Sequence, residues 1–200
     1  MLRVGIFRGA FSPIHNGHVS AAKEFMRQMW IDVLFVIPSR SDAHGVSAID
    51  RLKMCELAFE GVDGVIVSDI EIRDRKEGSL VSTLNSLGDS DRRLFLLCGT
   101  DEILGLGSRA DADDVFRLAY PTYVRREADP LIDERIVQRV TEYRTKYGKN
   151  IVRINADAVD ISSTEIRRRA RAGDNISALV PTAVAGYIKE KGLYCNENQL

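Results

Sequence analysis

Short apolar runs alternate with helix-like segments along nearly the whole chain, and this alternation limits the fold more than any other feature. Each run is too short for a stable helix and stops at a Gly, a Pro or a polar residue, as strands do. The runs are residues 2–7, 33–37, 65–67, 93–98, 120–124 and 151–154. Strands that alternate with helices predict an α/β fold, with a Rossmann-like, doubly wound parallel sheet and helices on both of its faces.

The segments between and after these runs are expected to be helical, because their apolar residues recur at helical spacing or their charges alternate. The expected helices are residues 16–30, 48–59, 82–87, 113–118, 131–147, a segment from Ser162 to Gly173 and one from Pro181 to Gly192. Asn16 is expected to cap the first of them. The last two make a C-terminal helical segment. The chain, 44% hydrophobic, is expected to form a single domain over residues 1–200.

Composition excludes several classes of function. The 28 Lys and Arg residues and 29 Asp and Glu residues leave a formal net charge of −1, so we expect no nucleic-acid partner. The sequence has no apolar run approaching about 20 residues and no charged-then-apolar leader, which predicts a cytoplasmic protein that does not engage a membrane. The three cysteines lack metal-ligand spacing, so no metal site made by the protein alone is predicted.

The first apolar run leads through a Pro turn into two histidines, His15 and His18, at a helix start. Residues three apart share one face of a helix, and a helix N-terminus attracts phosphate through its N–H groups and partial positive charge. Gly9 lets backbone N–H groups approach a phosphate closely, and Gly17 leaves room between the histidines. The pattern predicts a polyphosphate cradle that faces a crevice at the carboxyl ends of the strands. Two surface histidines in a turn, or a general base, are the alternatives.

A second polar group follows the last apolar run, at Ser162, Ser163, Thr164, Glu165 and Arg167. Ser162 and Glu165 have the spacing of a capping box, so a well-capped helix with a solvated basic face is one interpretation. In the other, Ser163 and Thr164 donate to phosphate and the Arg167 guanidinium binds it as a fork. We expect this group and the histidine pair to converge on one bound triphosphate.

The two motifs resemble those of the HxGH nucleotidylyltransferases, G-x-F-x-P-x-H-x-G-H and I-S-S-T-x-I-R, in the family's order. The resemblance implies that His15, His18 and Arg167 are catalytic. Gly99 and Asp101 resemble the family's G-x-D, in which Asp contacts the nucleoside, although Asp101 could equally cap the next helix. The ATP-binding residues implied by the resemblance are Phe7, Gly9, Ala10, His15, Gly17, His18, Gly99, Asp101, Ile161, Ser162, Ser163, Thr164 and Arg167.

Within this family the sequence is most similar to the bacterial nicotinate-nucleotide adenylyltransferases, and the similarity covers essentially the whole chain. It implies adenylyl transfer from ATP to the phosphate of nicotinate mononucleotide, with pyrophosphate released and no covalent enzyme intermediate. The acceptor phosphate is already an anion, so positioning and electrostatics suffice. Mg²⁺ is expected to arrive with the ATP phosphates. The acceptor-binding residues implied are Arg40, His44, Arg51, Leu80, Thr83 and Arg109.

Several positions depart from the family pattern. Arg8 and Ala10 flank Gly9 where the family has Gly and Thr or Ser, and the remaining departures are Ser12 for Asp, Gly45 for Lys, Asp50 for His, Leu80 for Thr and Arg109 for Trp. Loss of a stacked ring and a hydroxyl costs about 1 kcal/mol each or more. Two alternatives therefore stay open: a nucleotidylyltransferase that uses a different phosphomonoester, and a nucleotide-binding protein without turnover. Arg40 and Arg109 would favour a more anionic acceptor, and a homo-oligomer is compatible with the sequence.

Overall fold

The structure is a computed structural model that describes residues 1–73, 79–125, 129–156 and 161–195. The chain divides into two compact units, each made of three separate stretches. Unit 1 contains Met1–Phe7, Ala21–Phe35 and Ser79–Ala158, and unit 2 contains Arg8–Ser20, Val36–Gly78 and Val159–Leu200. The single domain expected from the sequence stays a prediction.

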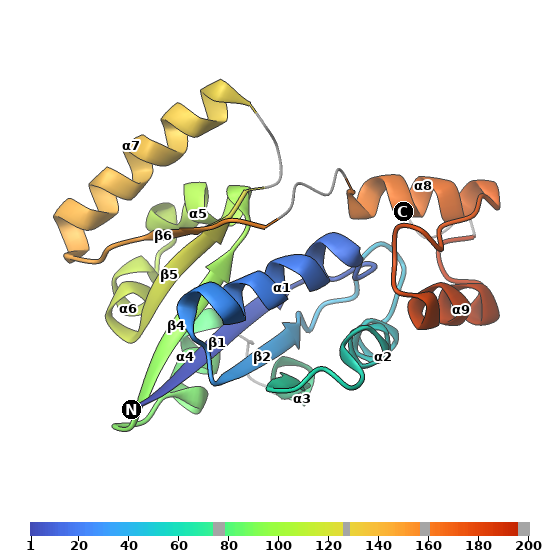
Figure 1. Cartoon of the computed structure of the whole chain (residues 1–200), viewed down its shortest axis with the longest axis horizontal. Helices are drawn as coiled ribbons and strands as arrows, with labels where there is room; N and C mark the ends of the chain where they lie inside the picture. The colour runs from blue at the N-terminus through green and yellow to red at the C-terminus, as the bar shows by residue number, and fades with distance from the viewer. Residues whose placement is uncertain (74–78, 126–128, 157–160, 196–200) are drawn as a thin grey trace. The chain divides into compact units, whose positions relative to one another are not determined.

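Among the described residues, six strands form one sheet in the order β3-β2-β1-β4-β5-β6, and Figure 1 labels all of these strands except β3. The strands are β1 (Leu2–Gly9), β2 (Val33–Pro38), β3 (Val65–Val67), β4 (Arg92–Cys98), β5 (Ala119–Val124) and β6 (Val152–Ile154). Pairing is parallel between β1 and β4, between β4 and β5, and between β5 and β6. The strand order reverses after β3, as in doubly wound folds. The predicted Rossmann-like α/β class is confirmed.

The helices largely follow the predicted segments. They are α1 (Asn16–Met29), α2 (Ala48–Phe59), α3 (Ile70–Arg73), α4 (Leu80–Leu87), α5 (Thr100–Gly105), α6 (Ala112–Leu118), α7 (Pro130–Tyr147), α8 (Ser163–Ala172) and α9 (Thr182–Lys191), with a 3₁₀ turn at Leu106–Ser108. The short helices α3 and α5 are not predicted from the sequence, because one or two turns carry too little periodicity to detect. In unit 2, α2 packs against α9 (Figure 1).

Nearby residues predicted some helix ends correctly and others wrongly. Gly173 and Gly192 end α8 and α9 in the left-handed conformation, at φ 75° and 61°, as the sequence predicts. The expected Asn16 cap is wrong by one residue, because the His15 carbonyl accepts the first helical N–H groups, from His18 and Val19. Asn16 is the first helical residue, and its side-chain amide donates to the Ala178 carbonyl at 3.1 Å.

Buried strands and one glycine make the core of unit 1. In β4 every residue from Leu94 to Cys98 is buried, as expected of a central parallel strand. A Cβ atom at Gly5 in β1 would lie within 2.9 Å of side-chain atoms of Phe25, Ile31 and Leu34. Gly5 therefore lets α1 and β2 pack closely on β1, which gives this part of the first motif a structural reason.

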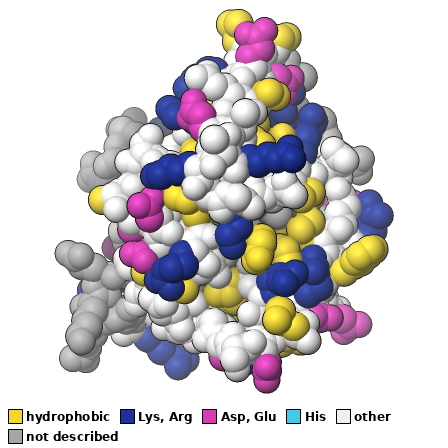
Figure 2. Space-filling view, turned by 90° about the vertical axis from the view of Figure 1, so that its left-hand side faces the viewer, with side chains coloured by type: hydrophobic (Ala, Val, Ile, Leu, Met, Phe, Trp, Pro, Cys, Tyr) yellow, Lys and Arg dark blue, Asp and Glu magenta, His cyan; other side chains and the backbone are white. Residues whose placement is uncertain are grey.

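The surface carries charges of both signs. On the face that Figure 2 shows, Lys and Arg side chains lie among hydrophobic ones, with Asp and Glu side chains close by. This mixture accords with the formal net charge of −1.

Candidate active site

The loop after β1 leads into the two predicted histidines, and both are buried. His15 is 1% exposed and His18 is 7% exposed. Their ring centroids lie 3.7 Å apart, and Phe11 meets His18 edge-on with centroids 5.2 Å apart. The spacing thus brings the two rings together as predicted. The expectation that they face a crevice at the carboxyl ends of the strands stays a prediction.

One hydrogen bond determines which nitrogen of His18 carries the proton. The backbone N–H of His15 donates to Nδ1 of His18 at 3.3 Å. A neutral imidazole that accepts at Nδ1 holds its proton at Nε2. The fold therefore orients His18 as an Nε2–H donor, which is the form that can stabilise an anion.

The start of α8 is capped by one half of the predicted capping box. The Ser162 hydroxyl oxygen accepts from the backbone N–H of Glu165 at 3.1 Å. The Glu165 carboxylate accepts from Arg168 and Arg169. These hydrogen bonds, the one from Arg168 first, lower the pKa of Glu165 to about 2. The basic face of α8 is thus partly neutralised by its own helix.

The two sequence motifs contact one another inside unit 2. The Ser163 hydroxyl donates to the Pro13 carbonyl at 3.1 Å. The Arg167 guanidinium donates through Nη1 to the Ser12 carbonyl at 2.8 Å and through Nη2 to the Thr164 hydroxyl at 3.1 Å. Consecutive carbonyls of the first loop therefore hold the first turns of α8. The segments that carry the early and late motifs therefore lie side by side, and their convergence on one triphosphate stays a prediction.

A tight turn at residues 43–46 lies against the same loop. Ala43 and Val46 exchange two backbone hydrogen bonds at 3.1 Å, and the central residues His44 and Gly45 have φ 54° and 71°. Two positive φ angles define a type I′ turn, which favours Gly. The Gly at position 45 thus has a backbone reason. Partial burial, then the cations Arg167 and Arg51, lower the pKa of His44.

The Arg51 side chain connects two loops through hydrogen bonds. Its side chain is 0% exposed, and it donates to the carbonyls of Ala10, Ser39 and Ser41 at 2.5 to 2.7 Å. Burial lowers its pKa. A guanidinium enclosed in this way joins the first loop to the loop after β2. We therefore replace the predicted acceptor contact of Arg51 with this role.

Sequence reasoning missed an ion pair at the start of the first loop. The Arg8 Nε donates to the carboxylate of Glu71, a side chain of α3 that is 1% exposed. Glu71 belongs to a helix that the sequence did not predict. The one signal of the ion pair was Arg8 itself, a cation at the end of an apolar strand. The departure at Arg8 is thus accompanied by a buried carboxylate partner.

The remaining predicted residues of unit 2 lie on or near the same loops. Gly9, Gly17 and Ile161 are half-buried, and Ala10 and Arg40 are exposed. A Cβ atom at Gly9 would lie 3.2 Å from the Phe11 ring. The Asp50 carboxylate accepts from the Ser47 hydroxyl at 2.6 Å and from the Tyr187 hydroxyl at 2.8 Å.

The other predicted residues belong to unit 1. Phe7, Leu80 and Thr83 are buried, at 4%, 1% and 3% exposed. The Arg109 guanidinium is forked onto Asp111 at 2.7 and 2.8 Å, which satisfies part of its capacity to bind an anion. Gly99 is the N-cap of α5, and Asp101 lies exposed in the first turn of that helix. The Asp101 cap alternative is therefore wrong.

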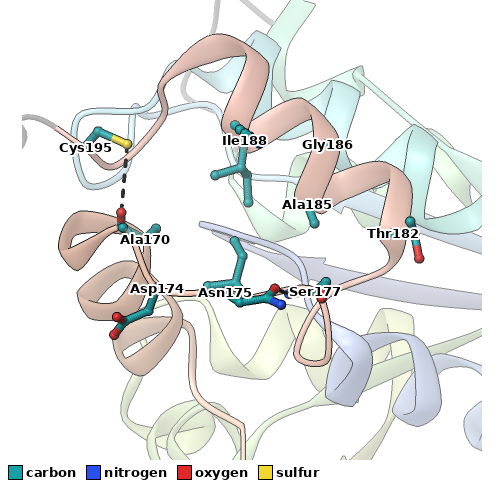
Figure 3. A pocket seen from close by; sticks show the side chains of 12 residues that line it. Ala170, Asp174, Asn175, Ser177, Thr182, Ala185, Gly186, Ile188 and Cys195 are labelled. Atoms are coloured by element: carbon teal, nitrogen blue, oxygen red, sulfur yellow. Dashed lines mark hydrogen bonds between the residues drawn. The ribbon is translucent and has the colours of Figure 1, made fainter.

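A separate cavity of about 690 Å³ lies between α8 and α9 (Figure 3). Small and polar side chains, including Ala170, Asp174, Ser177 and Gly186, line it together with Cys195. No residue predicted to bind ATP or the acceptor is among its lining residues.

The described part of the chain offers neither a membrane-spanning helix nor a metal-binding cluster. None of its helices is long and apolar enough to cross a membrane. Among the same residues, no three His, Cys, Asp or Glu side chains stand together in a way that could hold a metal ion.

This site, a histidine pair and an arginine-bearing helix joined through one loop of a Rossmann-like fold, is typical of nucleotidyl transfer. Residues 6–169 match the model of the family described as cytidylyltransferase-like. The chain therefore belongs to the cytidylyltransferase-like family and is a nucleotidyltransferase.

Curated relatives show which group within this family the chain belongs to. The chain is 32% identical to a "probable nicotinate-nucleotide adenylyltransferase" of Desulfatibacillum aliphaticivorans, over 96% of this chain and 100% of the relative. It is 33% identical to one of Gemmatimonas aurantiaca, over 96% and 92%. A Plasmodium falciparum nicotinic acid mononucleotide adenylyltransferase complexed with APC has the same fold, with a TM-score of 0.73 at 17% identity, over 97% of this chain and 98% of that one. The two curated relatives place the chain among the nicotinate-nucleotide adenylyltransferases.

Proposed function

We propose that this chain transfers the adenylyl group of ATP to the phosphate of nicotinate mononucleotide and releases pyrophosphate. The observation that carries the proposal is the 2.8 Å hydrogen bond from Arg167 to the Ser12 carbonyl, which joins the two motifs in one unit. A cation, two imidazoles and helix N–H groups then surround the place where a triphosphate would bind.

Charge stabilisation is the work that these residues can do. The acceptor phosphate attacks the α-phosphorus in line, the bond to the β-phosphate oxygen breaks, and charge builds on the pyrophosphate. His18, with Nε2–H as its donor, and His15 would hold the triphosphate, and Arg167 would neutralise the leaving group. Groups fixed before reaction are effective because they need no reorganisation. No side chain has to act as nucleophile, because the acceptor is already an anion.

Ser163 and Thr164 would bind phosphate at the start of α8. Both lie in its first turn, where backbone N–H groups have no helical partner. Ser163 already donates its hydroxyl to Pro13, so its backbone N–H is the donor that we assign to ATP. Ser162 keeps the capping role, and Ile161 precedes it. Gly99 and Asp101 stay predicted contacts of the nucleoside.

Mg²⁺ would enter with ATP. The ion prefers oxygen ligands and keeps several of its waters, and substrate phosphates commonly supply much of the rest of its coordination. The predicted phosphate-binding side chains His15, His18, Ser163, Thr164 and Arg167 are imidazoles, hydroxyls and a guanidinium group, which suit phosphate better than a hard cation. When bound, the ion would screen the charge of the β- and γ-phosphates.

Acceptor recognition is assigned to His44 and Arg40. His44 stands exposed at the tip of the type I′ turn, and its lowered pKa keeps the ring neutral at pH 7, so it can donate a hydrogen bond without adding charge. Arg40 is exposed in the same loop and suits the acceptor phosphate. Buried Leu80 and Thr83, and Arg109 on Asp111, are weaker candidates for direct contact.

The test is an acceptor panel. Pyrophosphate release would be measured with ATP, Mg²⁺ and either nicotinate mononucleotide, nicotinamide mononucleotide or other phosphomonoesters. We expect the highest kcat/KM with nicotinate mononucleotide. Release only with another phosphomonoester would contradict the acceptor and retain the reaction type. ATP binding without release from any acceptor would contradict catalysis itself.

A further inference from the structure

Ser12 joins three segments of unit 2 that are distant in sequence. Its hydroxyl donates to the Ala43 carbonyl at 3.0 Å and lies 3.0 Å from the Tyr194 hydroxyl. Its carbonyl accepts from Arg167 at 2.8 Å. The residue is 2% exposed, so these contacts are shielded from water. One residue thereby supports Arg167 on one side and the turn that presents His44 on the other.

Tyr194 is the hydrogen-bond donor in its pair with Ser12. A serine hydroxyl has a single proton, and that of Ser12 goes to Ala43. The Ser12 oxygen must then accept from Tyr194. Burial raises the pKa of the Tyr194 hydroxyl far above its usual value, so the phenol keeps the proton that it donates.

The backbone around Tyr194 is itself fixed. Gly192 ends α9 in the left-handed conformation, and the Leu193 N–H donates to the Ile188 carbonyl at 3.0 Å. Tyr194 is also left-handed, at φ 65°, and is 2% exposed. The next residue, Cys195, directs its thiol at the Ala170 carbonyl of α8, 3.9 Å away (Figure 3). This segment therefore contacts both α8 and α9, and these contacts place the phenol beside Ser12.

We propose that Tyr194 is a positioning residue, which holds Ser12 so that Arg167 and the His44 turn keep the geometry needed for adenylyl transfer. The proposal rests on the proposed function of this site. Tyr194 lies 182 residues from Ser12 in the sequence, and it touches neither ATP nor acceptor in this scheme. Its effect passes through the Ser12 hydroxyl to the Ser12 carbonyl, which accepts the hydrogen bond from Arg167.

Loss of the Tyr194 hydroxyl should disturb the alignment of Arg167 and the His44 turn more than the stability of the fold. Without the phenol hydroxyl the Ser12 oxygen loses a buried donor, and its hydroxyl can rotate away from Ala43. Both the Arg167 anchor and the turn then gain freedom. Small displacements of groups that bind a reacting phosphate reduce rate more than they reduce folding stability.

The test is Tyr194→Phe, with Tyr187→Phe as matched control. Both variants remove one tyrosine hydroxyl, and the Tyr187 hydroxyl donates to Asp50 at 2.8 Å, away from Ser12. We expect Tyr194→Phe to lower kcat/KM for ATP by roughly fivefold or more, the effect of about one hydrogen bond. Tyr187→Phe should change it less than about twofold. The two variants should have similar thermal midpoints.

A double-mutant cycle tests whether the effect of Tyr194 passes through Ser12. Ser12→Ala should lower kcat/KM as Tyr194→Phe does, and the double variant should lose no more than either single one, because both break the same link. Ser12→Thr, which keeps the hydroxyl, should restore most of the activity. Additive losses, or a loss with Tyr194→Phe that tracks a fall in thermal midpoint and equals that of Tyr187→Phe, would overturn the proposal.

Affinity for α,β-methylene-ATP separates this proposal from the proposed reaction. It is measured calorimetrically on the full chain and does not depend on the acceptor. If the wild-type protein releases no pyrophosphate with nicotinate mononucleotide, the proposed function is contradicted. In that case Tyr194→Phe should still weaken binding of the analogue, and Tyr187→Phe should not. Unchanged affinity together with unchanged kcat/KM in Tyr194→Phe would contradict the positioning role.

Discussion

The guanidinium of Arg167 donates to the carbonyl oxygen of Ser12 at 2.8 Å, although 155 residues separate the two in the sequence. This contact brings the histidine loop and the start of α8 into one site. It also means that Arg167 has a structural partner before any substrate binds. Partial burial lowers the pKa of Arg167 from its ordinary value, but a guanidinium remains charged at neutral pH.

Arg167→Ala should weaken ATP binding. Loss of a charge-assisted contact to phosphate costs about 1.5–3 kcal/mol, so KM for ATP should rise by about 10- to 100-fold. Arg168→Ala is the control, because this neighbouring, exposed arginine is bonded to Glu165 and not to the first loop. Steady-state kinetics at varied ATP would measure both. Equal effects in the two variants would show that Arg167 acts only through its general positive charge and makes no specific contact with ATP.

His18→Asn should lower turnover by about 100-fold or more, since one lost donor to a developing anion commonly has this effect. Asn can still accept a hydrogen bond from the His15 N–H but offers a weaker donor at a different place. His18→Ala should also lower stability, because the ring is 7% exposed and contacts Phe11. Single-turnover pyrophosphate release and thermal unfolding separate the two effects. Wild-type turnover in both variants would remove His18 from the mechanism.

Removal of Arg8 should lower the free energy of unfolding more than removal of the Glu71 charge. Glu71 is 1% exposed and Arg8 is 25% exposed, so removing the arginine leaves the more deeply buried charge. Arg8→Met should lower the free energy of unfolding by about 3 kcal/mol, and Glu71→Gln by less. The double variant Arg8→Met with Glu71→Leu should recover part of the loss. Urea unfolding measures all three, and the reverse ranking of the single variants would contradict this account.

Glu165 should contribute to acid sensitivity. Its pKa is lowered from 4.5 to about 2 by hydrogen bonds from Arg168 and Arg169. A depressed carboxylate pKa stabilises the fold above about pH 4.5 and loses that contribution as the pH falls towards 2. Glu165→Gln should therefore lower the thermal midpoint at pH 6 and have little effect near pH 2. Because the pair is on the surface, added salt should shrink the difference.

The control for this measurement is Glu134→Gln, at an exposed glutamate of α7. Its thermal midpoint should follow that of the wild type across the same pH range. A Glu165→Gln curve parallel to the wild-type curve from pH 6 to pH 2 would show that the arginine pairs contribute nothing to folding.

Much of the fold was predictable because its signals are local. The apolar runs predict all six strands, and Gly173 and Gly192 predict the ends of two helices, since a left-handed residue is needed there and Gly adopts it without strain. Helices α3 and α5 escaped prediction because they are too short for a periodic pattern. Asn16 was misplaced by one residue because a backbone carbonyl took the place of a side-chain cap.

For the candidate site, the sequence predicted that the two histidine rings lie together, but it did not predict the hydrogen bonds between distant segments. The spacing of His15 and His18 predicts that their rings meet, and they do. Nothing in the sequence indicates that both are buried or that Arg51 is enclosed by carbonyls. Burial depends on every neighbour in the fold, so local pattern carries little information about it.

The sequence by itself determined the class of fold, the two motifs and the positions where the backbone must turn, because each depends on residues close together in the chain. Only the tertiary structure decided that Ser12 joins Arg167, the His44 turn and Tyr194, and that Arg8 meets Glu71. Hydrogen bonds of about 3 Å are specified by the packing of whole helices and loops. No spacing along the chain encodes that packing directly.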